Sequence, residues 1–224
     1  ETWRYVQKGG FYWAGAYACD DYVLIGTDDG EDGYSSDTAN LLLLDPKSGK
    51  LLDSMTGFTG DIRCSICYDT ATKAFYFTSK GGYLYSVQVQ KSGSSWKLAN
   101  KKQLELGGMS TSTPVIHNGR AYIGVSGQGQ FTPYSGHNIT VVNLSNMSAA
   151  YRATTQGYPQ TSGLLTTAYE KSGNGYVYVY FFDNYTPGKL RVLRDKAGQT
   201  TAEYTSDEYA EKTKYTTAYE LFTP

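Results

Sequence analysis

Seven polar and aromatic side chains in this sequence form the pattern expected of a site for a polar or carbohydrate-like ligand. A tyrosine ring offers a flat stacking face, while hydroxyl, amide, guanidinium and imidazole groups offer directional hydrogen bonds. Most of them lie in polar stretches that precede predicted inner strands. The candidate residues are Arg63, Ser110, Thr111, His137, Tyr158, Gln160 and Ser162. The alternative interpretation is that the Ser, Thr and Gln side chains bond neighbouring backbone and serve the fold.

A second candidate site is an acidic loop in which carboxylates crowd around Gly30 and Gly33. Hard oxygen ligands, closely spaced on a turning backbone, are what a calcium ion requires. The candidate calcium ligands are Asp28, Asp29, Glu31 and Asp32. The spacing is not that of an EF-hand loop, because the twelfth position counted from Asp28 is Ala39 and not a bidentate Glu. The alternative interpretation is a solvated acidic turn between two strands.

The sequence contains few of the groups that nucleophilic or redox enzymes use. Cys64 and Cys67 form a C-x-x-C pair, but zinc requires four ligands and no second pair exists. On a strand, residues three apart point to opposite faces, so these two cysteines are not expected to form a disulfide. His117 lies in a predicted Asn-Gly turn with no acid near it in the sequence, which leaves only His137 for catalysis. We therefore predict no catalytic residues.

Composition indicates a β protein and excludes two classes of partner. The chain has 22 tyrosines and 25 glycines but only three methionines, which is typical of aromatic strands joined by tight turns. Lys and Arg number 20 against 21 Asp and Glu, so there is no basic surface for nucleic acid. No apolar run is long enough to span a bilayer, and we expect no membrane insertion of this segment. The first ten residues lack a signal-peptide pattern, which predicts an excised or mature piece.

A unit of about fifty residues recurs four times along the chain. The strongest strand patterns lie at 22–27, 74–79, 121–126 and 176–181. Each is preceded, across a turn, by a short strand at 14–19, 64–68, 114–117 and 164–170. Each is followed by a third strand at 41–45, 83–89, 139–144 and 190–194. A more polar fourth strand ends each unit, at 50–55, 96–105, 149–155 and 200–205.

Four strands per unit, with a polar outermost strand, is the pattern of propeller blades. The sequence therefore predicts an all-β chain forming a β-propeller, or partial propeller, of about four four-stranded antiparallel blades. We expect one domain over 1–224, with blades at roughly 11–57, 62–107, 112–156 and 163–206 and strand stubs at both ends. The alternative fold is a pair of β-sandwiches, which would not explain why the same unit recurs.

The segment Leu-Leu-Asp-Pro-Lys-Ser-Gly-Lys at 43–50 resembles the Asp-x-x-Thr-Gly-Lys turn of pyrroloquinoline-quinone-like (PQQ-like) propeller repeats. In that family a Trp follows four residues after the Gly, where this chain has Asp53, and the other three units have lost most of the motif. The resemblance implies the propeller fold. A quinone-dependent dehydrogenase of this family would also have an adjacent Cys pair and a Trp that stacks on the cofactor. This chain has no Cys-Cys, and its three tryptophans, Trp3, Trp13 and Trp96, are poorly placed for one shared site.

Runs at 60–63, 110–114, 135–140, 155–163 and 184–189 resemble propeller segments of large surface proteins of gut Clostridia. That resemblance implies an extracellular, cell-surface location and a multidomain parent. We therefore expect a non-catalytic module that binds a protein or carbohydrate at the cell surface, or that spaces other domains. Calcium is the only cofactor that the residues suggest. The alternative function is a relic or active PQQ-like oxidoreductase or lyase, with its site on the axial face of the propeller.

Overall fold

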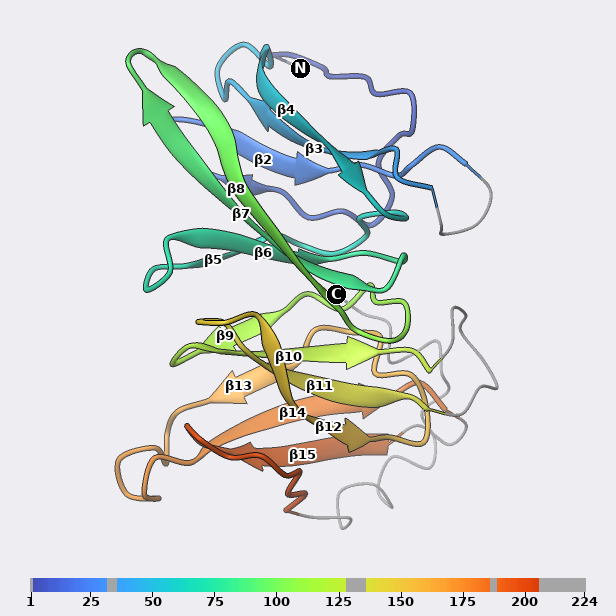
Figure 1. The fold of residues 1–224 in the computed structure, drawn as a ribbon, viewed down its shortest axis with the longest axis vertical. Helices are drawn as coiled ribbons and strands as arrows, with labels where there is room; N and C mark the ends of the chain where they lie inside the picture. Colours follow the sequence, from blue (N-terminus) through green and yellow to red (C-terminus); the bar gives the residue numbers. More distant parts are fainter. Residues whose placement is uncertain (1, 32–35, 128–135, 186–188, 206–224) are drawn as a thin grey trace. The chain divides into compact units, whose positions relative to one another are not determined.

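The computed structural model describes residues 2–31, 36–127, 136–185 and 189–205, and Asp32 lies outside them (Figure 1). Every regular element in these residues is a β-strand, and consecutive strands pair in antiparallel fashion within four separate sheets. The predicted all-β class is confirmed. In the described part of the chain, no helix has the length and apolar character needed to cross a membrane.

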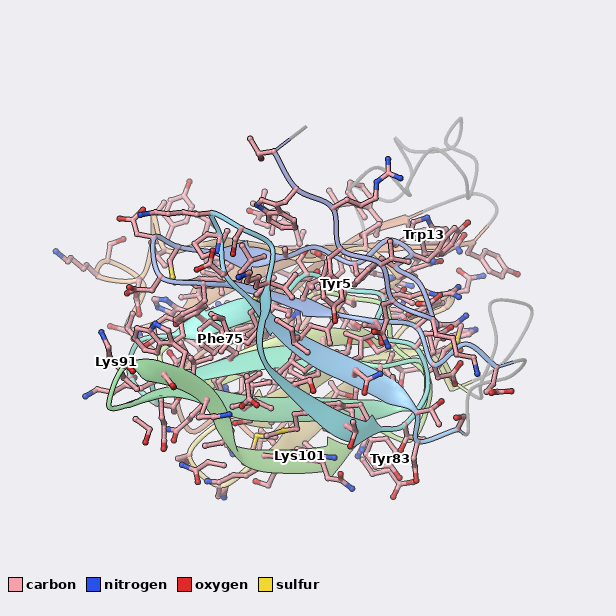
Figure 2. The ribbon with its side chains drawn as sticks, turned by 90° about the horizontal axis from the view of Figure 1, so that it is seen from above. Tyr5, Trp13, Phe75, Tyr83, Lys91 and Lys101 are labelled. Carbon is pink, nitrogen blue, oxygen red and sulfur yellow. The ribbon has the colours of Figure 1, made fainter. Side chains whose placement is uncertain are left out.

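The first two sheets follow the predicted four-strand pattern. The first has the order β1-β2-β3-β4, and the second the order β5-β6-β7-β8. The strands of the first are β1 (Tyr17–Ala18), β2 (Val23–Gly26), β3 (Ala39–Leu44) and β4 (Leu51–Phe58). Those of the second are β5 (Cys67–Asp69), β6 (Ala74–Thr78), β7 (Tyr83–Ser92) and β8 (Ser95–Glu105). Lys91 lies near the tip of the long β7–β8 hairpin (Figure 2).

The third sheet has four strands and the fourth has three. The third contains β9 (Val115–His117), β10 (Arg120–Val125), β11 (Asn138–Asn143) and β12 (Ser148–Thr154). The fourth contains β13 (Leu164–Thr166), β14 (Val177–Asp183) and β15 (Lys189–Asp195). The strand predicted over 200–205 is reduced to a bridge between Leu193 and Tyr204, flanked by two backbone hydrogen bonds. Residues 196–202 form a polar turn, so the chain returns to β15 only at Glu203.

The innermost strands are shorter than the sequence pattern predicts, with two or three residues each. The residues before these strands bond to other segments instead of extending the sheet. Gly15 forms a parallel bridge with Ser65, and Cys64 Sγ accepts the Thr78 N–H at 3.1 Å. After β13, residues 167–175 close a turn in which the Glu170 N–H donates to the Thr167 carbonyl. The alternation of residue types in the sequence therefore overestimates the length of these strands.

The chain forms two compact units, residues 1–105 and 106–224, which are considered separately below. The core of each unit lies between its two sheets, because alternate residues of each strand point inward. In the first unit the buried cluster includes Leu24, Leu41, Leu43, Phe58, Phe75, Phe77 and Tyr85. In the second it includes Tyr122, Ile139, Val141, Val177, Val179, Phe181 and Leu193. The predicted single domain over 1–224 stays a prediction.

One backbone hydrogen bond recurs in all four sheets. A residue one or two positions after the second strand donates its N–H to a carbonyl in the segment that leads into the same sheet. The donor and acceptor pairs are Asp28 and Gly10 (3.1 Å), Lys80 and Asp61 (2.9 Å), Ser126 and Met109 (2.9 Å), and Asn184 and Tyr158 (3.0 Å). This bond fixes each lead-in segment at the carboxyl end of the second strand.

The lead-in of the third sheet requires a glycine at position 108. A Cβ there would lie 1.8 Å from the Ser126 carbonyl oxygen, so Gly108→Ala must displace backbone. We expect this change to destabilise the second unit by about 1–3 kcal/mol, the range for overpacking. Urea unfolding followed by circular dichroism measures the loss. The matched control is Gly107→Asn, because Gly107 has φ +82° and open space, and Asn tolerates that conformation. A Gly108→Ala protein as stable as the control would contradict this account.

A buried ion pair lies at the amino end of β10, opposite the end at which Ser126 binds the lead-in segment. Arg120 Nε lies 2.8 Å from Asp195 Oδ2, and the two side chains are 5% and 0% exposed. The hydroxyls of Tyr122 and Tyr151 each donate to Asp195 at 2.7 Å. One carboxylate therefore joins β10, β12 and β15.

Asp195→Ala should be strongly destabilising, because it leaves the Arg120 charge buried without this carboxylate. We expect a loss of about 3–5 kcal/mol in the free energy of unfolding. The control is Glu203→Ala, which removes the more exposed ion pair with Arg194 and should cost about 0–1 kcal/mol. Thermal unfolding of both variants checks the difference, and equal losses would contradict it.

Candidate ligand-binding surface

Arg63 is held in place by two carboxylates of the first unit. Its Nε lies 3.0 Å from Asp28 Oδ1, and its Nη2 lies 2.7 Å from Asp28 Oδ2 and 2.9 Å from Asp61 Oδ2. Asp28 follows β2 and Asp61 follows β4. The guanidinium therefore links the segment between β2 and β3 to the segment between β4 and β5. The Arg63 side chain is 21% exposed, which places this rigid, planar group at the surface.

Two further charged residues, Asp29 and Lys80, lie beside Asp28, Asp61 and Arg63. We call these five residues the Asp–Arg–Lys cluster. Lys80 is buried, and its Nζ lies 3.5 Å from Asp61 Oδ2. The Asp29 N–H donates to Asp61 Oδ1 at 3.2 Å. Three acids and two bases leave the ionised cluster with one negative charge in excess. Burial raises the pKa of Asp28 in spite of Arg63, and burial also raises the pKa of Asp29.

Three consecutive aromatic residues lie beside Arg63 and are accessible to solvent. Phe11, Tyr12 and Trp13 are 37%, 51% and 58% exposed. The Arg63 Cζ lies 4.7 Å from the centre of the Tyr12 ring, and the Tyr12 and Trp13 ring centres are 4.8 Å apart, with the ring planes at 32° to each other. We call Phe11, Tyr12, Trp13 and Arg63 the aromatic–arginine patch. Only Arg63 was expected from the sequence, although three successive aromatics in a Gly-flanked segment were a visible signal.

The second unit brings three of the predicted ligand residues together but buries them. The Thr111 N–H donates to the Tyr158 hydroxyl at 2.7 Å, and the His137 ring stacks on Tyr158 with centres 6.2 Å apart. Tyr158 is fully buried and His137 is 2% exposed. Burial lowers the pKa of His137, whose Nδ1 accepts the Gly127 N–H at 3.0 Å. The imidazole is therefore a neutral packing group in this arrangement.

The other predicted ligand residues of the second unit do not converge on a common point. Ser110 is buried and donates to the Gly124 carbonyl at 2.8 Å. Gln160 is buried and accepts from the Asn184 amide at 3.4 Å, whereas Ser162 is exposed. These contacts match the alternative interpretation, in which polar lead-in residues bond neighbouring segments. A ligand-binding role for them stays a prediction.

The acidic loop is largely occupied by internal bonds. Asp28 binds Arg63, and Asp29 Oδ1 accepts the Glu31 N–H at 2.9 Å. Within the residues that the structure covers, no group of three or more His, Cys, Asp or Glu side chains is arranged to hold a metal ion. Asp32 lies outside those residues. Calcium binding by Asp28, Asp29, Glu31 and Asp32 stays a prediction.

His117 has an acidic partner that the sequence did not indicate. Its Nε2 lies 2.9 Å from Glu170 Oε1, and the Asn118 amide donates to the same oxygen at 2.6 Å. Glu170 belongs to the turn after β13, so the tertiary structure supplies the acid that is missing near His117 in the sequence. The three groups tie the β9–β10 turn to the turn between β13 and β14.

Cys64 and Cys67, the two cysteines of the C-x-x-C pair, are not joined by a disulfide. Burial raises the pKa of Cys64 to about 11 and that of Cys67 to about 12. The thiolate is the reactive form, so few of these thiols are ionised near neutral pH.

We expect Cys64 and Cys67 to react with Ellman's reagent only after denaturation. Thiol counting at about pH 8 in native buffer and in guanidinium measures this, because an unperturbed thiol has a pKa of about 8.5. The Cys19→Ser variant removes the third thiol and serves as the matched background. Rapid labelling of two thiols in the native Cys19→Ser protein would contradict the expected burial.

No protein-family model matches the sequence, and no curated protein is a significant relative. Solved structures do match. A quinohemoprotein alcohol dehydrogenase of Pseudomonas putida aligns with a TM-score of 0.50 and 14% identity, over 88% of this chain and 35% of that one. The WD40 β-propeller domain of Doa1 aligns at 0.49 and 15%, over 89% of this chain and 56% of that one. BamB from Moraxella catarrhalis aligns at 0.44 and 11%, over 87% and 63%.

This chain spans 35% to 63% of the length of these three proteins. At such low identity the likeness to the alcohol dehydrogenase shows the fold alone. Together with the four sequential antiparallel sheets, it confirms the predicted β-propeller fold.

Proposed function

We propose that this chain is a non-catalytic propeller module that binds a glycan through the aromatic–arginine patch. The observation that carries the proposal is the exposed Tyr12–Trp13 pair, which is stacked beside a guanidinium anchored by two carboxylates. Large aromatic side chains left in water commonly mark a binding surface. Tyr and Trp offer apolar area with few rotatable bonds, so ordering them on binding costs little entropy.

The patch is preorganised by the charges beneath it. Asp28 and Asp61 fix the Arg63 fork, and the Arg63 guanidinium in turn lies over the Tyr12 ring. Trp13, at 58% exposure, leaves much of its surface to stack on the apolar face of a sugar ring. A platform ordered before binding loses less conformational entropy in the complex.

The size and charge of the patch favour a glycan over a protein or an ionic ligand. A stable protein interface takes about 20–30 residues from each partner, whereas this patch has four. The charges of Arg63 and Lys80 are offset by three neighbouring carboxyl groups, so the site has no strong attraction for an anion. A neutral polyol fits this combination of aromatic surface and balanced polar groups.

A PQQ-like oxidoreductase has weaker support in this chain. The fold likeness to the alcohol dehydrogenase carries no activity with it. The buried imidazole of His137 has a lowered pKa, and the Cys64 and Cys67 thiols have raised ones. The proposal therefore includes no organic cofactor. It includes a cell-surface location, which rests on the resemblance of several sequence runs to clostridial surface proteins.

A glycan and mucin array with the purified chain tests the proposal. Trp13→Ala should weaken binding about thirtyfold, the effect of removing an aromatic hot spot worth about 2 kcal/mol. The matched control is Tyr169→Ala, because Tyr169 is also 58% exposed but lies in the second unit. It should bind like the unchanged chain.

A blank array, or equal losses from both variants, would contradict glycan binding at this patch and would favour a protein partner or a scaffolding role. Repeating the array in calcium and in EDTA tests the acidic loop separately. Binding that needs calcium would support a metal at Asp28, Asp29, Glu31 and Asp32.

A further inference from the structure

The second unit contains four Asn-x-Ser/Thr sequences, the pattern that asparagine glycosyltransferases recognise. In such a sequence the sugar is transferred to the Nδ2 atom of the asparagine, and the enzyme also requires the hydroxyl two residues later. A bulky sugar fits only at the protein surface, so burial decides which asparagine of a folded chain can accept it. The four asparagines are Asn138, Asn143, Asn146 and Asn184.

Two of these asparagines are buried, and their side chains already form hydrogen bonds. Asn138 is 8% exposed, its Nδ2 donates to the Gly136 carbonyl at 3.0 Å, and its Oδ1 accepts the Thr140 hydroxyl at 2.6 Å. Asn184 is 6% exposed, and its Nδ2 donates to Gln160 Oε1 at 3.4 Å. An enzyme could reach either nitrogen only after these bonds break and the surrounding structure opens.

Asn143 is half-buried but belongs to a strand that is paired on both sides. It is the last residue of β11, where it lies opposite Arg120 of β10 and Ser148 of β12. Its Oδ1 accepts from Arg120 Nη1 at 3.3 Å. An enzyme cannot enclose the backbone at this position without separating the strands, which again requires local opening.

Asn146 differs from the other three because it lies in the exposed turn between β11 and β12. Residues 144–147 form this turn and connect Asn143 to its partner Ser148. The Ser148 hydroxyl donates to Asn146 Oδ1 at 2.8 Å, so the two side chains that define the pattern are in contact. Among the residues that the structure describes, none forms a hydrogen bond with Asn146 Nδ2. The nitrogen that accepts the sugar is therefore not committed to another group.

We propose that Asn146 is an N-glycosylation site, at which the folded second unit accepts a sugar from a donor activated at its anomeric carbon by a phosphate leaving group. Asn146 Nδ2 forms a bond to the anomeric carbon and loses one proton. The bond between that carbon and the phosphate oxygen breaks, and the phosphate carrier leaves with the electron pair. Nothing is oxidised or reduced. The inference does not depend on glycan binding by the aromatic–arginine patch, which lies in the first unit.

The fold makes a prediction that the sequence pattern alone does not. Trypsin releases residues 121–152 as one peptide, because no Lys or Arg lies between Arg120 and Arg152. This peptide contains Asn138, Asn143 and Asn146, so it is a matched control in which the same three sequences lack the fold. The folded chain and the peptide are each incubated with a soluble asparagine glycosyltransferase and nucleotide-activated glucose, and mass spectrometry measures the occupancy of each asparagine.

In the folded chain, the occupancy of Asn146 should exceed that of the other three asparagines by at least about tenfold, because their modification requires local opening. This preference should disappear in the released peptide. If the contact between Asn146 and Ser148 served only the shape of the turn, the folded chain would stay unmodified. An unmodified folded chain, or one modified mainly at another asparagine, would overturn the proposal.

Two variants of Ser148 test the pattern without changing the acceptor. Ser148→Ala removes the hydroxyl and should abolish modification of Asn146, whereas Ser148→Thr should retain it. Circular dichroism checks that both variants fold like the unchanged chain. Modification of Ser148→Ala at the level of Ser148→Thr would contradict recognition through this pattern.

Peptide mapping of the chain isolated from the cells that produce it gives a readout without added enzyme. We expect a sugar on Asn146 and none on Asn138, Asn143 or Asn184. A single hexose would identify a nucleotide-activated donor, and a larger oligosaccharide would identify a lipid-carried one. An unmodified Asn146 in that material would overturn the proposal.

Discussion

Each sheet of this chain is tied, at the carboxyl end of its second strand, to the segment that leads into its first strand. The tie is a single backbone hydrogen bond that recurs in all four sheets. Because a buried backbone group must be paired, the bond constrains the lead-in more strongly than side-chain contacts alone. It also explains why the lead-in residues Arg63, Thr111 and Tyr158 carry the polar contacts of both units. The chain therefore holds these three residues at fixed positions.

The two units use this shared position for different chemistry. In the first unit the groups are acidic and basic, and Arg63 lies within hydrogen-bond distance of both Asp28 and Asp61. In the second unit they are neutral, with Thr111, Tyr158 and His137 bonded or stacked. Neutral polar groups that hydrogen-bond to each other can be buried at little cost in free energy. Each buried charge, in contrast, requires an opposite charge beside it. The first unit therefore depends on balanced charges, whereas the second depends on neutral hydrogen bonds and ring contacts.

The same reasoning separates fold from function. The propeller architecture depends on strand alternation and on the recurring backbone bond, neither of which specifies a ligand. The exposed aromatics Phe11, Tyr12 and Trp13 are not part of the core cluster of the first unit, and the Tyr12 ring lies against the Arg63 guanidinium. They can therefore change without loss of the fold, and we infer that this region of the chain determines what is bound. The buried tyrosines, such as Tyr122 and Tyr151 on Asp195, are committed to holding the strands together.

The sequence alone determined the β class, the four-fold recurrence, the antiparallel hairpins and the approximate place of every strand. Those features depend on alternation and turn residues within about ten positions of one another, which can be read locally. It also indicated that Cys64 and Cys67 do not form a disulfide with each other. Only the tertiary structure decided the short inner strands, the partner of His117, the burial of Tyr158 and His137, and the place of Tyr12 beside Arg63. Each of these depends on residues about fifty positions apart, or on which neighbour a side chain meets, and pairing at that distance is set by register and packing.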